Sequence, residues 1–145
     1  MTMDELELVC QEAARSLAAR SDRPVPATVV VPLAAATKVT SLPEWPDDDP
    51  GRFDLLEAFA RDVLRPADAP CYGFVAEALA VDDDGSPVDV LVVAFGARGH
   101  ATRLTAAPVL GDGLGPFAPS EELLPTALPF LSPLQHAVDA APPVS

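Results

Sequence analysis

The stretch from Cys71 to Ala107 constrains the fold more than any other part of the chain. It contains three runs rich in Val, Phe and Thr, at residues 71–81, 88–95 and 101–107, and the turns between them carry Asp84-Gly85 and Arg98-Gly99. Apolar, β-branched runs joined by short glycine-containing turns are typical of antiparallel hairpins. The stretch therefore predicts a three-stranded antiparallel meander.

A two-residue turn centred on Asp84-Gly85 predicts that Val81 lies opposite Val88. Because side chains alternate between the two faces of a strand, this register also predicts the composition of each face. One face is small and aromatic and suits a packed helix: Phe74, Ala76, Ala78, Leu91, Val93, Phe95 and Leu104. The other carries Val75, Leu79, Val81, Val88, Val90 and Val92, with Glu77, Arg103 and Thr105 among them. It is too apolar to face water, so we expect the C-terminal tail, a further strand or a second copy of the chain to cover it.

Two helices and two more strands are predicted before the meander. Residues 2–20 begin with a capping-box spacing and repeat apolar residues at helical intervals. Residues 50–65 begin with proline, carry an apolar stripe and end before Pro66. Residues 27–31 and 36–42 fit short strands. The sequence thus predicts an α+β fold, with an antiparallel sheet of about four to five strands and both main helices packed on one face.

Prolines recur at positions 125, 129 and 133 in an otherwise apolar C-terminal segment. Because interior prolines break helical hydrogen bonding, short helices that restart are expected here, beginning with a turn at residues 120–124 and ending with a helix from Ser132 to about Ala140. We expect one α+β domain over residues 1–119 and a proline-rich helical tail over 120–145, which docks on that domain or on a partner.

The charge balance excludes some classes of partner. The chain has 22 acidic and 9 basic residues, a formal net charge of −13, so binding to nucleic acid or to an anionic membrane surface is not expected. The N-terminus lacks signal-peptide features and no apolar run reaches membrane-span length, which predicts a cytoplasmic protein. The acidic excess fits either solubility at high salt or a basic protein partner, for which the chain would act as an acidic decoy or inhibitor.

The metal-ligating residue types are few and scattered. Cys10 and Cys71 fall in a predicted helix and a predicted strand, where two packed free thiols are expected. His100 and His136 have no further ligands at metal-site spacing. The sequence therefore predicts no metal site and no cofactor.

Glu77 is the most interesting single position, because a carboxylate between apolar strand residues is costly to bury without a partner. As a catalytic site, Glu77 would act as a general base oriented by Arg103, with His100 or Thr105 nearby. The structural interpretation, an ion pair or a glutamate at a wet edge or dimer interface, is favoured. Trp45, the only tryptophan, lies in the loop before the second helix, where it either covers the core or, if exposed, offers a binding platform.

The segments Phe74-Val-Ala-Glu-Ala78 and Val90-Leu-Val-Val-Ala94 are separated by an acidic turn and followed by the turn at Arg98-Gly99. Over about residues 71–107 this pattern resembles a set of small uncharacterised bacterial proteins. The resemblance implies an α+β fold with the meander in the C-terminal half, and it implies no activity.

Two functions follow from these features. The favoured hypothesis is a non-catalytic domain that acts through self-association or protein binding, most simply a homodimer joined through the Val-rich face or the tail. The alternative is a small enzyme or small-molecule-binding protein with a site around Glu77, Arg103 and His100, in which Trp45 and Thr105 are candidate binding residues.

Overall fold

A computed structural model of the chain describes residues 2–20, 24–111, 113–124 and 126–142. Three α-helices and an antiparallel sheet confirm the predicted α+β class. The elements are α1 (Met3–Arg20), β1 (Thr28–Pro32), β2 (Thr37–Ser41), α2 (Asp49–Phe59), the π-helix η1 (Ala60–Leu64), β3 (Cys71–Val81), β4 (Pro87–Ala97), β5 (Arg103–Leu110), β6 (Gly113–Leu114), β7 (Glu121–Glu122), the 3₁₀ helix η2 (Pro129–Leu131) and α3 (Ser132–Asp139). No helix within these residues is long and apolar enough to cross a membrane.

The sheet has the strand order β2-β1-β3-β4-β5-β6, and β7 also pairs with β5. It therefore has more strands than the four to five predicted. The two additional strands have two residues each and lie along the free edge of β5. Residues 120–124, predicted to begin a helical turn, are extended instead, because Glu121 and Glu122 pair with the β5 backbone.

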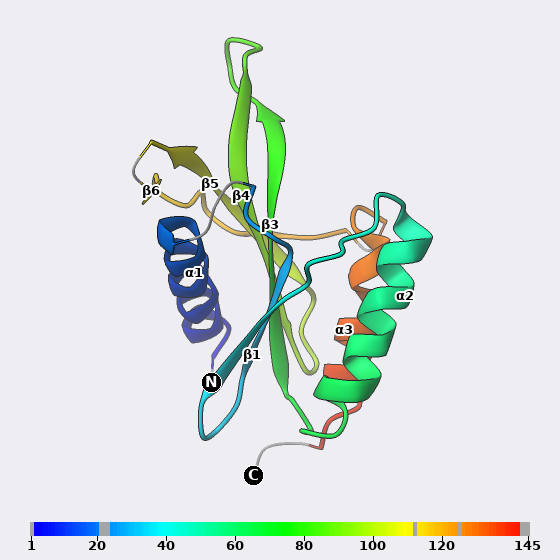
Figure 1. Cartoon of the computed structure of the whole chain (residues 1–145). Helices are drawn as coiled ribbons and strands as arrows, with labels where there is room; N and C mark the ends of the chain where they lie inside the picture. Colours follow the sequence, from blue (N-terminus) through cyan, green and yellow to red (C-terminus); the bar gives the residue numbers. More distant parts are fainter. Residues whose placement is uncertain (1, 21–23, 112, 125, 143–145) are drawn as a thin grey trace.

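Helices cover both faces of the sheet (Figure 1). On one face α1 packs through Leu6, Cys10, Ala14 and Leu17 against Val75, Leu91, Val93 and Phe95. On the other face α2, η1, η2 and α3 pack through residues such as Leu56, Leu64, Phe130 and Leu134 against Tyr72, Phe74 and Ala94. The prediction that both main helices share one face is wrong.

The sheet faces also differ in composition from the prediction, because of the turn between β3 and β4. Val81 pairs with Pro87, and the loop between them has five residues, 82–86, in place of the predicted two-residue turn. The Asp82 carboxylate accepts hydrogen bonds from the backbone N–H groups of Asp84 and Ser86, each at 2.9 Å, and Gly85 has a φ of 81°. An odd number of loop residues in place of an even number shifts the register by one, so the side chains of β4 lie on the opposite faces from those predicted.

The predicted capping box at the start of α1 is confirmed. The Thr2 hydroxyl accepts a hydrogen bond from the Glu5 N–H at 3.1 Å, and the Glu5 carboxylate accepts one from the Thr2 N–H at 3.2 Å. These bonds favour the ionised carboxylate and lower the pKa of Glu5. The cap fixes the start of the helix that covers one face of the sheet.

The described part of the tail packs on the face opposite α1, where α3 contacts α2, η1, β3 and β4. Gln135 ties α3 to the β4–β5 turn, because its amide nitrogen donates to the carbonyl oxygens of Ala97 and His100, both at 3.0 Å. The hydroxyl of the buried Tyr72 donates to the Gln135 oxygen at 3.2 Å and lies 2.9 Å from the Thr102 hydroxyl. Burial raises the pKa of Tyr72 to about 12, so this network holds a neutral phenol.

Candidate functional site

The distal half of the β3–β4 hairpin projects beyond the body of the molecule (Figure 1). Leu79 is 70 % exposed and Val81 is 71 % exposed on this arm, residues 78–90. Because large apolar side chains at adjacent same-face positions of one strand form a patch, the arm is a candidate interaction surface.

Among the described residues, no strand pairs with the tip of this arm at either edge. The β1 ladder along β3 ends at Val75, and none of the described strands pairs with residues 78–81 on that side. The β5 ladder along β4 covers Val90 to Phe95 and does not reach Pro87 or Val88. Unpaired strand edges are templates for pairing with another chain. The arm therefore combines an apolar patch with open backbone edges.

Glu77 lies where the arm meets the body. Its side chain is half-buried, and its carboxylate accepts a hydrogen bond from the backbone N–H of Val25 at 3.1 Å. This contact ties the segment before β1 to β3. The structure thus assigns Glu77 a positioning contact at the base of the arm.

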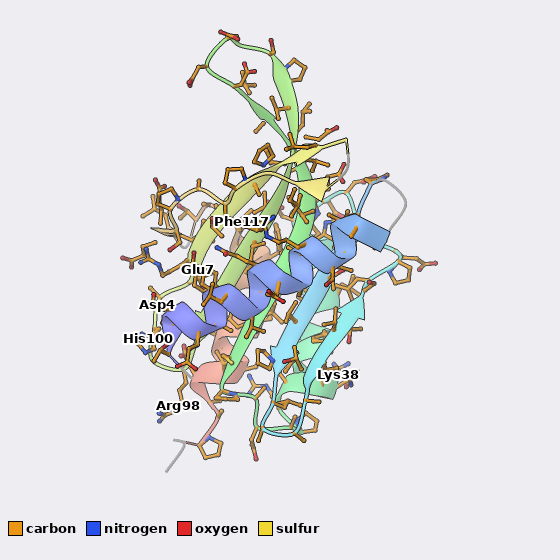
Figure 2. The ribbon with its side chains drawn as sticks, turned by 90° about the vertical axis from the view of Figure 1, so that its left-hand side faces the viewer. Asp4, Glu7, Lys38, Arg98, His100 and Phe117 are labelled. Atoms are coloured by element: carbon orange, nitrogen blue, oxygen red, sulfur yellow. The ribbon has the colours of Figure 1, made fainter. Side chains whose placement is uncertain are left out.

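Arg103 and His100 line a separate pocket of about 310 Å³, together with Asp4, Glu7 and Glu122. The Arg103 guanidinium donates to the Ser120 hydroxyl at 3.1 Å and to the Ser120 carbonyl at 2.7 Å. The Ser120 hydroxyl in turn donates to Glu7 at 3.2 Å. Figure 2 shows Asp4, Glu7 and His100 at the N-terminal end of α1. Arg103 therefore joins the β7 segment to α1.

The structure brings His100 and Arg103 together but does not bring Glu77 to them. A two-residue turn at Arg98-Gly99 predicts Ala94 opposite Arg103, but Phe95 pairs with Arg103. This shift of one residue adds to the shift between β3 and β4. Thr105 lies across from Val93 and Val75, and its hydroxyl donates to the Ala118 carbonyl. Arg103 lies level with Gly73, four residues along β3 from Glu77. At about 3.4 Å per residue, this spacing is too long for one reaction centre.

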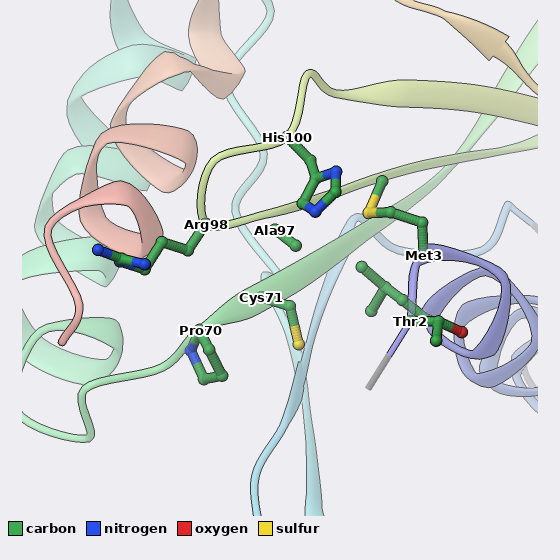
Figure 3. Close-up of a pocket in the computed structure, with 8 residues that line it drawn as sticks. Thr2, Met3, Pro70, Cys71, Ala97, Arg98 and His100 are labelled. Carbon is green, nitrogen blue, oxygen red and sulfur yellow. The ribbon is translucent and has the colours of Figure 1, made fainter. Parts of the chain in front are cut away.

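His100 also lines a pocket of about 500 Å³ beside Cys71, Met3 and Arg98. Figure 3 shows the His100 ring turned toward Met3 and the Arg98 side chain turned away from it. Burial raises the pKa of the Cys71 thiol, which keeps it protonated and a poor nucleophile. Within the described ranges, no group of three or more His, Cys, Asp or Glu side chains has an arrangement that holds a metal ion.

Trp45 lies in a groove of about 530 Å³ on the face opposite α1. Its ring centroid is 5.3 Å from that of Phe74 and 5.5 Å from that of Phe130, and Phe74 and Phe130 are 5.9 Å apart. The three rings form one wall of the groove, and Ala76, Ala78 and Val92 at the base of the arm also line it. Trp45 thus covers the core, and its half-buried ring also lines the groove; its role as a binding platform stays a prediction.

Sequence reasoning missed three contributors to these surfaces. Leu79 and Val81 were assigned to a covered face, although the arm extends beyond every element that covers the sheet. Arg52 was not singled out, yet its guanidinium lies over the rings of Trp45 and Phe130. The acidic, glycine-containing loop at 82–86 was the available signal that this end of the hairpin faces water.

No protein-family model, curated protein or solved structure matches the chain.

Proposed function

We propose that the protein is a non-catalytic domain that acts by self-association, as a homodimer joined through the arm at residues 78–90 and the β3 edge within it. The observation that carries this proposal is the exposure of Leu79 and Val81 on a strand whose outer edge, at these positions, pairs with no strand that the structure describes. Both central sheet faces are occupied by helices of the same chain, so neither the Val-rich face nor the docked tail is the proposed interface.

The β3 edge from residue 78 to 81 favours pairing with the same edge of a second copy. Two identical edges related by a two-fold axis pair in antiparallel fashion, and each gains backbone hydrogen bonds. In this arrangement Leu79 and Val81 of the two copies lie on one face of the joined ribbon, where their apolar surfaces are removed from water.

Charge also favours the antiparallel arrangement. Asp82, Asp83 and Asp84 form the exposed tip of the arm. A parallel pairing would place the two acidic tips side by side, whereas the antiparallel pairing sets each tip beside the body of the other copy. The acidic tip therefore selects one orientation and disfavours longer stacks of arms.

Light scattering of the eluting protein tests the proposal. We expect the wild-type protein to elute with twice the chain mass of 15.1 kDa. The double variant Leu79→Glu/Val81→Glu places like charges across the two-fold axis, so it should elute as a monomer with unchanged circular dichroism, because both side chains are exposed.

The matched control is Leu8→Glu/Val39→Glu, which exchanges one Leu and one Val that are exposed on α1 and on the edge strand β2. This variant should keep the wild-type mass. A wild-type protein that stays monomeric at concentrations used for structural work would contradict the proposal. A control variant that dissociates while the arm variant does not would move the interface to β2 or α1.

A further inference from the structure

The groove beside Trp45 has the composition of a ligand site. It is enclosed by the three aromatic rings, by Pro24, Pro26 and Pro43, and by small apolar side chains of β3 and β4. Its volume of about 530 Å³ falls within the range of small-molecule pockets, which are mostly apolar with a few placed polar groups. Here the placed cation is Arg52.

Arg52 is held in a fixed position with its terminal nitrogens unused. Its Nε donates to the Pro46 carbonyl at 2.7 Å, and its guanidinium carbon lies 5.4 Å from the Trp45 ring centroid and 5.6 Å from that of Phe130. Neither terminal nitrogen makes a hydrogen bond or ion pair with any residue that the structure describes. The ring contacts and the Nε bond orient the guanidinium before any ligand arrives.

Two other arginines with several contacts, Arg15 and Arg103, differ from Arg52 in this respect. Arg15 stacks on Phe117 at 5.1 Å, but its two terminal nitrogens donate to the carbonyls of Leu114 and Gly115. Arg103 is bound through Nε and a terminal nitrogen to Ser120. Those two guanidinium groups hold loops to the body. Arg52 also holds a loop through Nε, but its two terminal nitrogens can donate to another acceptor.

We propose that this groove binds a small apolar molecule with one carboxylate. The apolar body lies against Trp45, Phe74 and Phe130, and the carboxylate accepts two parallel hydrogen bonds from the terminal nitrogens of Arg52, a pairing that guanidinium geometry favours. The chain carries a net charge of −13, so ligands with two or more negative charges are repelled more strongly than a monocarboxylate. This selects a monocarboxylate over a phosphate or a dicarboxylate.

Trp45 is the only tryptophan, so its fluorescence reports on the groove directly. The probes are 4-phenylbutyrate and its neutral analogue 4-phenyl-1-butanol, which share the apolar body and differ in the carboxylate. We expect 4-phenylbutyrate to shift the Trp45 emission in a saturable manner and to bind at least about tenfold more tightly than the alcohol, as one charge-assisted pair allows. Calorimetry checks the same affinities without the fluorophore.

The variant Arg52→Gln removes the cation and should lower the affinity for 4-phenylbutyrate to that for the alcohol, with the alcohol affinity unchanged. The control Arg61→Gln makes the same exchange at an exposed arginine paired with Asp62, and it should leave both affinities unchanged. If the Arg52→Gln variant does not fold, the ratio of the wild-type affinities for 4-phenylbutyrate and 4-phenyl-1-butanol still tests the proposal. Equal affinities for the two probes, or no saturable Trp45 response to either, would overturn the proposal.

The groove and the arm share Ala78, but the side chains proposed to hold the ligand, Trp45, Arg52, Phe74 and Phe130, all lie outside the arm, so the site does not require a second copy. The same titrations with Leu79→Glu/Val81→Glu should give the wild-type affinities, since both exchanged side chains lie outside the groove lining. If the wild-type protein is a monomer and still binds 4-phenylbutyrate, only the proposed dimer is contradicted. If it is a dimer and Trp45 fluorescence does not respond, only the ligand site is contradicted.

Discussion

The two halves of the β3–β4 hairpin share the same strands and the same cross-strand pairing, yet they differ completely in environment. In the proximal half, Tyr72, Val75, Val93 and Phe95 are fully buried between α1 and the α2–α3 layer. In the distal half, Leu79 and Val81 are more than two-thirds exposed. The difference shows that burial here is decided by where the covering helices end and not by the composition of the strands.

A cavity in the proximal half should have the largest effect on stability. Phe95→Ala removes a fully buried ring under α1, and we expect it to lower the free energy of unfolding by about 3–5 kcal/mol. Urea denaturation at low protein concentration measures this without a contribution from association. A loss below about 1 kcal/mol would mean that the proximal half is not the packed core.

Alkaline pH should weaken the proximal half through Tyr72. Its pKa is raised from 10.0 to about 12 by burial, so the neutral phenol stabilises the fold fully below pH 10, and this contribution is lost as the pH rises toward 12. The expected loss is on the order of 2 kcal/mol. The buried Cys10 thiol, whose pKa is also raised to about 12, adds a loss of the same sign.

The variant Tyr72→Phe separates these two alkaline contributions. It lacks the phenol, so its stability should fall less between pH 9 and pH 12 than that of the wild-type protein. An identical pH dependence of unfolding in both proteins would show that Tyr72 is not the group that titrates.

Weakening the cap of α1 should have a smaller effect on the same half. Thr2→Ala removes the hydroxyl of the capping box, with an expected cost of about 1 kcal/mol in thermal or urea unfolding. The pKa of Glu5 is lowered first by the hydrogen bond from the Thr2 backbone, which the variant keeps, and second by the Thr2 hydroxyl, which it loses. A part of the advantage of wild type over variant should therefore be present above pH 4.5 and decline as the pH falls below it. If the stability difference between wild type and variant does not change with pH, the ionisation of Glu5 does not contribute to the effect of the Thr2 hydroxyl.

The distal half should tolerate truncation. Leu79→Ala removes a side chain that is 70 % exposed, and we expect a change within about 0.5 kcal/mol in the monomer, measured by urea unfolding under the dilute conditions used for Phe95→Ala. A loss comparable to that of Phe95→Ala would mean that the arm folds back on the body in solution.

The hairpin also shows how far the sequence determines this fold. The Val- and Phe-rich runs predicted β3, β4 and β5 to within a few residues, because strand propensity and alternation are local properties. The register depended on whether Asp82 would cap its own loop, and the resulting odd-numbered loop exchanged the faces of β4. The composition of both sheet faces followed from this local choice.

The candidate surfaces were less predictable for a related reason. Glu77, Arg103 and Thr105 share one sheet face, as predicted, because two register shifts of one residue each return the side chains to the same face. The same shifts move Glu77 away from the other two residues along the strands. The groove at Trp45 joins residues from the loop, β3 and η2 that are distant in sequence. Such a site depends on tertiary contacts that no local pattern encodes.

Hydrogen exchange of the β3 backbone at residues 78–81 tests the central claim most directly, because alternate amides of this segment point away from β4. If the arm pairs with a second copy, those amides should become protected as the protein concentration rises, while amides between Leu91 and Phe95, which are paired on both sides, stay unchanged. Equal exchange of residues 78–81 in dilute and concentrated protein would contradict the proposed self-association.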